Sequence, residues 1–331
     1  MQEKATDLTR VGILGLGLLG GAFARHLIAA GIRTFGYDVS HAQMDALNCL
    51  GGHSRASARA VAEQADIVIT SLPHSMALEQ VLLGDDGIAA AGRPALIVIE
   101  TSTLAIETKE QARVQLAAAG IRMLDAPISG TGAQAQHKDI TVLVSGERTD
   151  FETTRDLLSH VARSVRYVGE FGDGSKIKLI ANLLVAIHTL AAAEAMVLGE
   201  SAGLDPATLL EVLTDSAATS RMLEVRGPSM AHHTYATPMI RLDVFQKDLD
   251  LIWAFARQWK CAVPLFSASV PWFTAAGAQN MGGYDNAAVV SILRQMAGTL
   301  PETNPADVRP AAASDPEITG RTGNSPATHN T

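Results

Sequence analysis

Cysteines and clusters of basic residues are scarce in this sequence of 331 residues. The two cysteines, Cys49 and Cys261, lie far apart, so we expect neither a disulfide framework nor a cysteine-based metal site. Free cysteines are typical of a reducing compartment, which favours a cytoplasmic location. The chain has no block of Lys or Arg and carries a net charge of −8, so it lacks the positive charge that a nucleic-acid partner requires. We therefore expect no bound metal and no nucleic acid.

Long uninterrupted hydrophobic runs are missing as well. Residues 1–10 are polar and contain no apolar stretch of signal-peptide length. The most apolar segment, residues 179–199, contains Asn182, His188 and Glu194. A membrane-spanning helix tolerates few such groups, so we expect this segment to form a helix buried inside the protein, with no membrane partner.

The composition that remains is that of a globular protein. Hydrophobic residues make up 47% of the chain, charged residues 18% and aromatic residues only 5%. This balance excludes a disordered or fibrous protein. The apolar share comes largely from alanine, which favours closely packed helices, and the length suffices for about two domains.

The first half of the chain alternates between strand-like and helical patterns. Continuous apolar runs are typical of strands in a parallel sheet covered on both faces, and helical patterns between them predict βαβ units. The predicted strands are 11–14, 34–37, 67–70, 96–99, 122–124 and 141–144, and the predicted helices include 20–30, 41–50, 75–83 and 104–119.

The pattern becomes helical throughout from about residue 175, with breaks expected at glycine and proline pairs such as Gly227-Pro228. We therefore predict an α/β domain at 11–170 and an all-α domain at 171–300 that forms the substrate and dimerisation domain. A flexible N-terminus at 1–10 and a disordered tail at 301–331 are expected on either side.

A glycine pattern follows the first predicted strand and opens the first predicted helix. In this setting the first glycine permits a tight turn, the second lets the backbone approach a pyrophosphate, and the third lets helix and strand pack closely. The N–H groups at the helix N-terminus favour phosphates. A Rossmann-type, doubly wound parallel sheet that binds a dinucleotide is therefore predicted, and a glycine-rich turn without a ligand is the alternative. The predicted cofactor-binding residues here are Gly15, Leu16, Gly17, Leu18, Leu19 and Gly20.

Asp38 ends the second predicted strand, where an acidic residue commonly accepts the ribose hydroxyls of the cofactor. Its carboxylate would repel a 2′-phosphate, so we expect NAD to be preferred, while NADP stays open. Capping of the following helix is a second role that Asp38 can have at the same time.

Two further segments, near the boundary between the two halves, contain candidate residues for substrate binding and proton transfer. Residues 125–132 form a turn-prone segment whose N–H and hydroxyl groups can hold a carboxylate, although an ordinary loop fits equally well. Lys178 and Asn182 lie four residues apart near the start of a long helix and share one face. A lysine among apolar neighbours has a lowered pKa, which suits proton transfer, whereas a lysine that extends to solvent is the alternative.

Together these motifs resemble the β-hydroxyacid dehydrogenase family, which includes 3-hydroxyisobutyrate dehydrogenase and tartronate semialdehyde reductase and shares its NAD-binding domain type with 6-phosphogluconate dehydrogenase. The resemblance extends from about residue 11 to about residue 300. The chain departs from the family pattern at Thr131, in place of a glycine, and at Ala181, in place of an asparagine. The matching motifs are the glycine loop, Asp125–Gly130, Gly172–Asn182, Lys247-Asp248-Leu249 and Gly282–Asp285.

The resemblance implies residue roles. Lys178 would be the general acid/base, and Asn182 would hold the substrate beside it. The residues implied to bind substrate are Ser129, Gly130, Thr131 and Lys247, with the carboxylate at the first three. Those implied to border the cofactor are Leu72, Pro73, Ser102, Thr103 and again Lys247.

The implied function is reversible hydride transfer between NAD(P) and a small 2- or 3-hydroxy acid, or its semialdehyde. An NADPH-dependent semialdehyde or imine reductase is the alternative, and a non-catalytic nucleotide-binding module is a further one. We also expect a homodimer or homotetramer formed through the helical domain.

Overall fold

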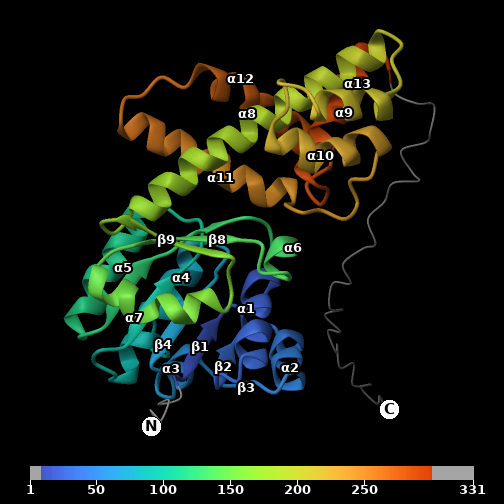
Figure 1. The fold of residues 1–331 in the computed structure, drawn as a ribbon. Helices are drawn as coiled ribbons and strands as arrows, with labels where there is room; N and C mark the ends of the chain where they lie inside the picture. Colours follow the sequence, from blue (N-terminus) through green and yellow to red (C-terminus); the bar gives the residue numbers. More distant parts are fainter. Residues whose placement is uncertain (1–8, 300–331) are drawn as a thin grey trace, which may run out of the picture.

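The computed structural model describes residues 9–299. Most of the N-terminus predicted to be flexible, and all of the tail predicted to be disordered, lie outside the described residues. Within the described part, the predicted α/β half followed by an all-α half is confirmed (Figure 1).

One sheet of nine strands forms the centre of the first half in the described residues. The order along the sheet is β3-β2-β1-β4-β5-β6-β8-β7, and β9 pairs with β8. All pairings from β3 to β6 are parallel, whereas β8 runs antiparallel to β6 and β7. The strands are β1 (Val11–Leu14), β2 (Thr34–Tyr37), β3 (His53–Ser54), β4 (Ile67–Thr70), β5 (Ile97–Glu100), β6 (Arg122–Asp125), β7 (Ile128–Ser129), β8 (Thr141–Ser145) and β9 (Ser164–Gly169).

Helices cover both faces of this sheet, which explains the continuous apolar strands. Ile67 and Ile69 of β4 pack on one face, against α1, while Val68 packs on the other face, against α3 and α4. The helices of this half are α1 (Leu18–Ala29), α2 (His41–Cys49), α3 (Ala58–Ala62), α4 (Ser75–Leu83), α5 (Ile106–Ala118), α6 (Gly132–Ala135) and α7 (Arg148–Ser159), with a 3₁₀ turn η1 (Ile88–Ala91).

Three strands were not predicted from the sequence. β3 and β7 contain two residues each, which is too short to show a period. β9 is only partly buried and contains Arg166, so it lacks the apolar run of the central strands. β9 pairs with β8, which also pairs with β7 (Ile128–Ser129), just before the long helix begins.

The long helix α8 (Asp173–Ser201) leaves the sheet and forms the axis of the second half (Figure 1). It contacts α10, α11, α12 and α13, and its apolar residues Leu179, Ala186 and Met196 are buried among them. The other helices are α9 (Pro206–Thr214), α10 (Arg221–His232), α11 (Leu242–Gln258), α12 (Pro264–Ala278) and α13 (Val289–Ala297), with a 3₁₀ turn η2 (Asn286–Ala288). The boundary near residue 170 stays a prediction about where independent domains divide.

The expected helix break at Gly227-Pro228 was wrong. α10 continues through both residues to His232. A Cβ at Gly227 would lie 2.3 Å from Leu210 Cδ1, so this glycine lets α9 and α10 approach closely. Tertiary packing therefore outweighs the local preference of this pair for a break.

By length and composition alone, α8 is the one described helix that could span a membrane. A helix of this composition is also found in the cores of globular proteins. Its contacts with the five helices α9 to α13 match the prediction of a buried helix.

Candidate active site

The glycine loop between β1 and α1 has the geometry that a pyrophosphate requires. Gly15 has a φ of +87°, and a Cβ there would lie 2.1 Å from the Ser71 carbonyl oxygen. A Cβ at Gly20 would lie 1.9 Å from the Gly15 carbonyl oxygen. A Cβ at Gly17, the residue before α1, would have no neighbouring atom within 4 Å, so the backbone there is open to a ligand. Two glycines therefore serve packing, the third leaves space, and the loop fits a dinucleotide.

Asp38 lies directly beside this loop. Its Oδ2 accepts a hydrogen bond from the Leu16 amide at 2.7 Å, and its Oδ1 accepts one from the Ser40 amide at 2.8 Å. Since Ser40 is the N-cap of α2, the carboxylate holds the glycine loop and the start of α2 together. A carboxylate has further acceptor capacity, so these bonds are compatible with binding ribose hydroxyls.

Hydrogen bonds join the other segments predicted to border the cofactor. The Leu72 amide donates to Ser102 Oγ at 2.8 Å, which joins the loops after β4 and β5. Lys247 of α11 donates from Nζ to the Thr103 carbonyl oxygen at 2.6 Å. The helical half therefore contacts the cofactor side of the sheet through Lys247. Pro73 lies next to Leu72 in the same loop.

The predicted carboxylate segment lies at β7 and the start of α6. Ser129 and Gly130 are exposed, and Gly130 has a φ of +133°, which a side chain would strain. Thr131 also has a structural role, because its amide and hydroxyl oxygen form a capping box with Gln134. The hydroxyl proton of Thr131 and one lone pair of its oxygen therefore remain for a substrate.

Four polar side chains gather where α8 meets α11. Asn182 donates from Nδ2 to Asp248 Oδ2 at 2.8 Å, and Lys247 Nζ lies 3.6 Å from Asp248 Oδ1. Asp248 Oδ1 is buried and has no hydrogen-bond partner in the described protein, so the nearby charge of Lys247 compensates it there. Burial raises the pKa of Asp248, while Lys247 and Lys178 lower it.

Lys178 lies one turn before Asn182 on the same face of α8. Burial lowers the pKa of Lys178, Asp248 opposes this by raising it, and Lys247 lowers it further. Its surface borders a cavity, so the ammonium group is withdrawn from bulk water while it stays open to a ligand. A lysine in this setting can exchange a proton with a substrate oxygen.

That cavity has a volume of about 340 Å³ and lies between the two halves. It brings together the predicted residues Ser129, Gly130, Thr131, Lys178 and Asn182, whereas Lys247 does not line it. The remaining lining residues are Gln134, Asp139, Thr141, Arg163, Ala181, Val185, Arg221, Met222, Val225, Arg226 and Ile240.

A charged network lies buried beneath this cavity. Lys109 of α5 donates from Nζ to Asp125 Oδ1 at 2.8 Å and to Ser175 Oγ at 3.1 Å, and lies 3.9 Å from Glu100. The Ser175 amide, in the first turn of α8, donates to Asp125 Oδ2 at 2.8 Å. The network therefore fixes the start of the helix that carries Lys178.

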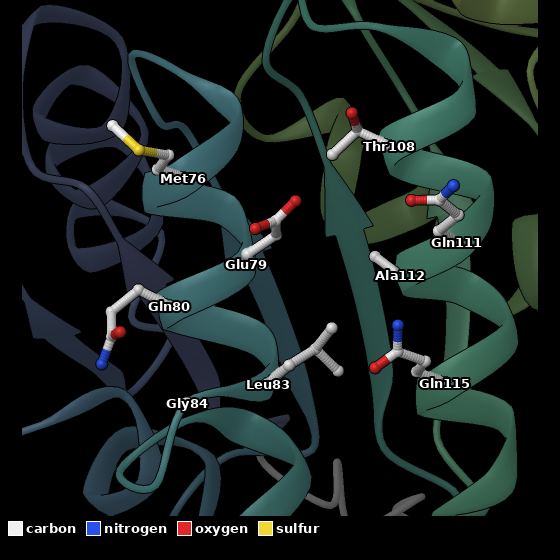
Figure 2. Close-up of a pocket in the computed structure, with 9 residues that line it drawn as sticks. All are labelled: Met76, Glu79, Gln80, Leu83, Gly84, Thr108, Gln111, Ala112 and Gln115. Carbon is white, nitrogen blue, oxygen red and sulfur yellow. The ribbon is translucent and has the colours of Figure 1, made fainter.

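A larger cavity, of about 580 Å³, is unrelated to these groups. Figure 2 shows Glu79 and Leu83 of α4 pointing into this groove toward α5, with Leu83 opposite Gln115. None of its lining residues belongs to the glycine loop, the carboxylate segment or α8. Size alone therefore does not identify the active site here.

Each half of the chain matches a known protein family. Residues 10–169 match the NAD binding domain of 6-phosphogluconate dehydrogenase, and residues 172–293 match the NAD-binding of NADP-dependent 3-hydroxyisobutyrate dehydrogenase. The chain belongs to the β-hydroxyacid dehydrogenase family.

Individual relatives agree with this assignment. The chain is 36% identical to an L-threonate dehydrogenase of Cupriavidus necator, over 85% of this chain and 95% of the relative. It is 31% identical to a 2-hydroxy-3-oxopropionate reductase of Escherichia coli, over 87% and 98%. Among solved structures, a 3-hydroxyisobutyrate dehydrogenase of Salmonella typhimurium matches with a TM-score of 0.78 and 34% identity, over 86% of this chain and 99% of that one.

This β-hydroxyacid dehydrogenase is an NAD(P)-dependent oxidoreductase that transfers a hydride between the nicotinamide cofactor and a small hydroxy acid or its carbonyl form, as predicted. Imine reductases, such as one from Streptomyces aurantiacus, share only the fold, with 17% identity and a TM-score of 0.59.

Sequence reasoning missed Asp248 as a member of the site. Its signal was available, because it directly follows Lys247 in a motif of the family. Its hydrogen bond to Asn182, 66 residues earlier, places it there.

Proposed function

We propose that this enzyme oxidises a small polyhydroxy acid of the L-threonate type, with NAD as the preferred cofactor and Lys178 as the general base. The observation that carries the proposal is the single cavity that Lys178 and Asn182 share with Ser129, Gly130 and Thr131. Five relatives named L-threonate dehydrogenase, 32–36% identical, support the choice of substrate.

The chain's own residues divide the work of binding and proton transfer. The exposed Ser129 hydroxyl and the Gly130 amide bind the substrate carboxylate, and the Thr131 hydroxyl donates to it. Asn182 holds the reacting oxygen next to Lys178. Lys178 Nζ, in its neutral form, takes the hydroxyl proton as the carbon–oxygen double bond forms. In the opposite direction the protonated lysine returns that proton to the carbonyl oxygen.

The nicotinamide cofactor, when bound, supplies the acceptor for the hydride that leaves the carbon carrying the reacting hydroxyl. The open backbone at Gly17 would hold its pyrophosphate, and the loops joined by the Leu72–Ser102 hydrogen bond would border it. Lys247, whose Nζ donates to the Thr103 carbonyl oxygen, would hold the helical half against the loop after β5.

The preference for NAD rests on Asp38. Its negative charge lies at the glycine loop, where a 2′-phosphate would meet it. Asp38→Asn keeps a carbonyl oxygen for the Leu16 amide but removes the charge, so the ratio of the NADP to the NAD dissociation constant should fall. Asp45→Asn, on the exposed side of α2, is the matched control and should leave that ratio unchanged. An unchanged ratio in Asp38→Asn would contradict the assignment.

A substrate panel tests the function itself. Purified enzyme is assayed with NAD and with NADP against L-threonate, 3-hydroxyisobutyrate and 2-hydroxybutyrate, with rates followed by nicotinamide absorbance. We expect the highest kcat/KM with L-threonate and NAD. A higher kcat/KM with 3-hydroxyisobutyrate, or no oxidation of any of the three, would overturn the substrate assignment.

We also propose a homo-oligomer formed through the helical half, in the cytoplasm. Apolar side chains are exposed there on α8 and α12, with Ile180 52% and Leu265 68% exposed. Burial of such residues stabilises subunit interfaces. Light scattering during size-exclusion chromatography should give the mass of a dimer or tetramer, and a monomer mass would contradict this.

A further inference from the structure

The wall of the substrate cavity that comes from the nucleotide-binding half is polar and continuously hydrogen-bonded. Gln134, which forms the capping box with Thr131, donates from Nε2 to Asp139 Oδ2 at 3.1 Å. Arg163 donates from Nε to Asp139 Oδ1 at 2.9 Å. All four side chains line the cavity, so this wall presents a fixed row of donors and acceptors to a substrate.

The opposite wall contributes two arginines of α10. Arg226 is 2% exposed, and its Nε donates to Asn286 Oδ1. Arg221 is largely exposed and donates to Glu224 at 2.9 Å. Hydrogen bonds from Gln134 and Arg163 lower the pKa of Asp139, and the charge of Arg221 lowers it further. Arg221 and Asp139 line the same cavity from opposite halves of the protein.

The charges around the cavity are balanced apart from the catalytic lysine. Arg163 pairs with Asp139, Arg221 pairs with Glu224, and Arg226 Nε lies 3.6 Å from Asp285 Oδ1. Each arginine thus has a carboxylate partner, and apart from Lys178 the described lining residues offer no uncompensated cation for a second substrate carboxylate. A neutral group that both donates and accepts hydrogen bonds matches this wall better than a second acid.

Hydroxyl groups have that property, and methyl groups do not. The Asp139 carboxylate accepts two hydrogen bonds from protein groups and retains further acceptor capacity. An alkyl substrate would displace water from these polar groups without replacing its hydrogen bonds, and such a mismatch is penalised strongly.

We propose that Asp139, with Arg221 across the cavity, binds the hydroxyl groups of the substrate beyond the reacting carbon and thereby selects polyhydroxy acids over deoxy acids of equal chain length. This inference rests on the proposed function, since it concerns the same cavity and names the groups that select its substrate. Thr131 takes part because its capping box fixes Gln134, and Gln134 in turn holds Asp139.

The test compares L-threonate with 2-hydroxybutyrate, which has the same number of carbons and lacks the outer hydroxyls. The selectivity is the ratio of their kcat/KM values. If turnover of 2-hydroxybutyrate is too slow to measure, the ratio is replaced by that of the two dissociation constants of the enzyme–NADH complex. Asp139→Asn should lower the selectivity about tenfold, the effect of one hydrogen bond to a charged group.

Arg221→Gln should lower the same ratio several-fold, and it serves as the second variant because this largely exposed residue is unimportant for packing. Asp156→Asn, an almost fully exposed aspartate on α7 that does not line the cavity, is the matched control and should leave the ratio unchanged.

An Asp139→Asn variant that lowers kcat/KM for both acids equally, or leaves both unchanged, would overturn the inference. This failure is distinct from failure of the proposed function, which would show in the unaltered enzyme as the absence of hydroxy-acid oxidation. If the unaltered enzyme prefers 2-hydroxybutyrate, the inference fails although the dehydrogenase function stands.

Discussion

The buried ion pair beneath the active site yields the most quantitative prediction. Lys109 and Asp125 are both 0% exposed, and their charged atoms lie 2.8 Å apart. Lys109→Met keeps an unbranched apolar side chain of nearly the same length but leaves Asp125 without its cation. Removing one partner of a buried ion pair typically destabilises a protein by about 3–5 kcal/mol, because an uncompensated charge remains in the interior.

The same change should reduce turnover as well. Asp125 accepts the Ser175 amide and thereby fixes the first turn of α8, three residues before Lys178. A looser start of α8 displaces the catalytic lysine, and displacements of about 1 Å can lower rates by about a hundredfold. The assays are urea unfolding of the NAD-free protein and steady-state kcat with L-threonate.

Two controls define the outcome. Lys176→Met removes a partly exposed lysine that pairs with Asp173 at 2.8 Å on the same helix turn, and it should change stability by about 1 kcal/mol or less. The double variant Lys109→Met with Asp125→Asn should be less destabilised than the sum of the single variants, by up to about 3 kcal/mol. If Lys109→Met loses less than about 1 kcal/mol, the reasoning about this network is refuted.

Other predictions concern Lys178 and the glycine loop. Burial lowers the pKa of Lys178 below the ordinary value of 10.5, and oxidation needs the neutral amine. The kcat/KM for oxidation should therefore rise with pH and level off below that value, whereas the reverse reaction should fall over the same range; a rise centred at or above 10.5 would contradict this. Gly20→Ala places a Cβ 1.9 Å from the Gly15 carbonyl oxygen and should lower both stability and NAD affinity, as measured by thermal unfolding and calorimetry. Gly17→Ala has open space around its Cβ and should weaken NAD binding while stability stays nearly unchanged; equal losses of stability in the two alanine variants would contradict the distinction.

The parts of the fold that sequence predicted are those in which the signal is local. The glycine pattern at 15–20 stands between an apolar strand and a helix, so its turn needs no distant partner to be recognised. Lys178 and Asn182 share a face because four residues make about one helical turn. The capping box at Thr131 has a local signal too, a threonine followed three residues later by glutamine, although it was not predicted.

The parts that sequence did not predict depend on contacts between distant residues. Lys109 lies on a helix with many charged residues, and only its packing against β6 and α8 shows that it is buried. Asp248 enters the site through Asn182, and Arg221 faces Asp139 only because the two halves meet at the cavity. α10 continues through Gly227 and Pro228, and Gly227 packs closely against Leu210 of α9. None of these relations has a period or a short motif.

The role of Lys178 is the central claim, and Lys178→Ala measured for turnover and for NAD binding tests it most directly. General acid–base catalysis contributes about 10²- to 10⁴-fold to a rate, so kcat should fall by at least about a hundredfold. The dissociation constant for NAD should stay nearly unchanged, because the cofactor loop lies at β1 and α1. A variant with near-normal kcat would contradict the account.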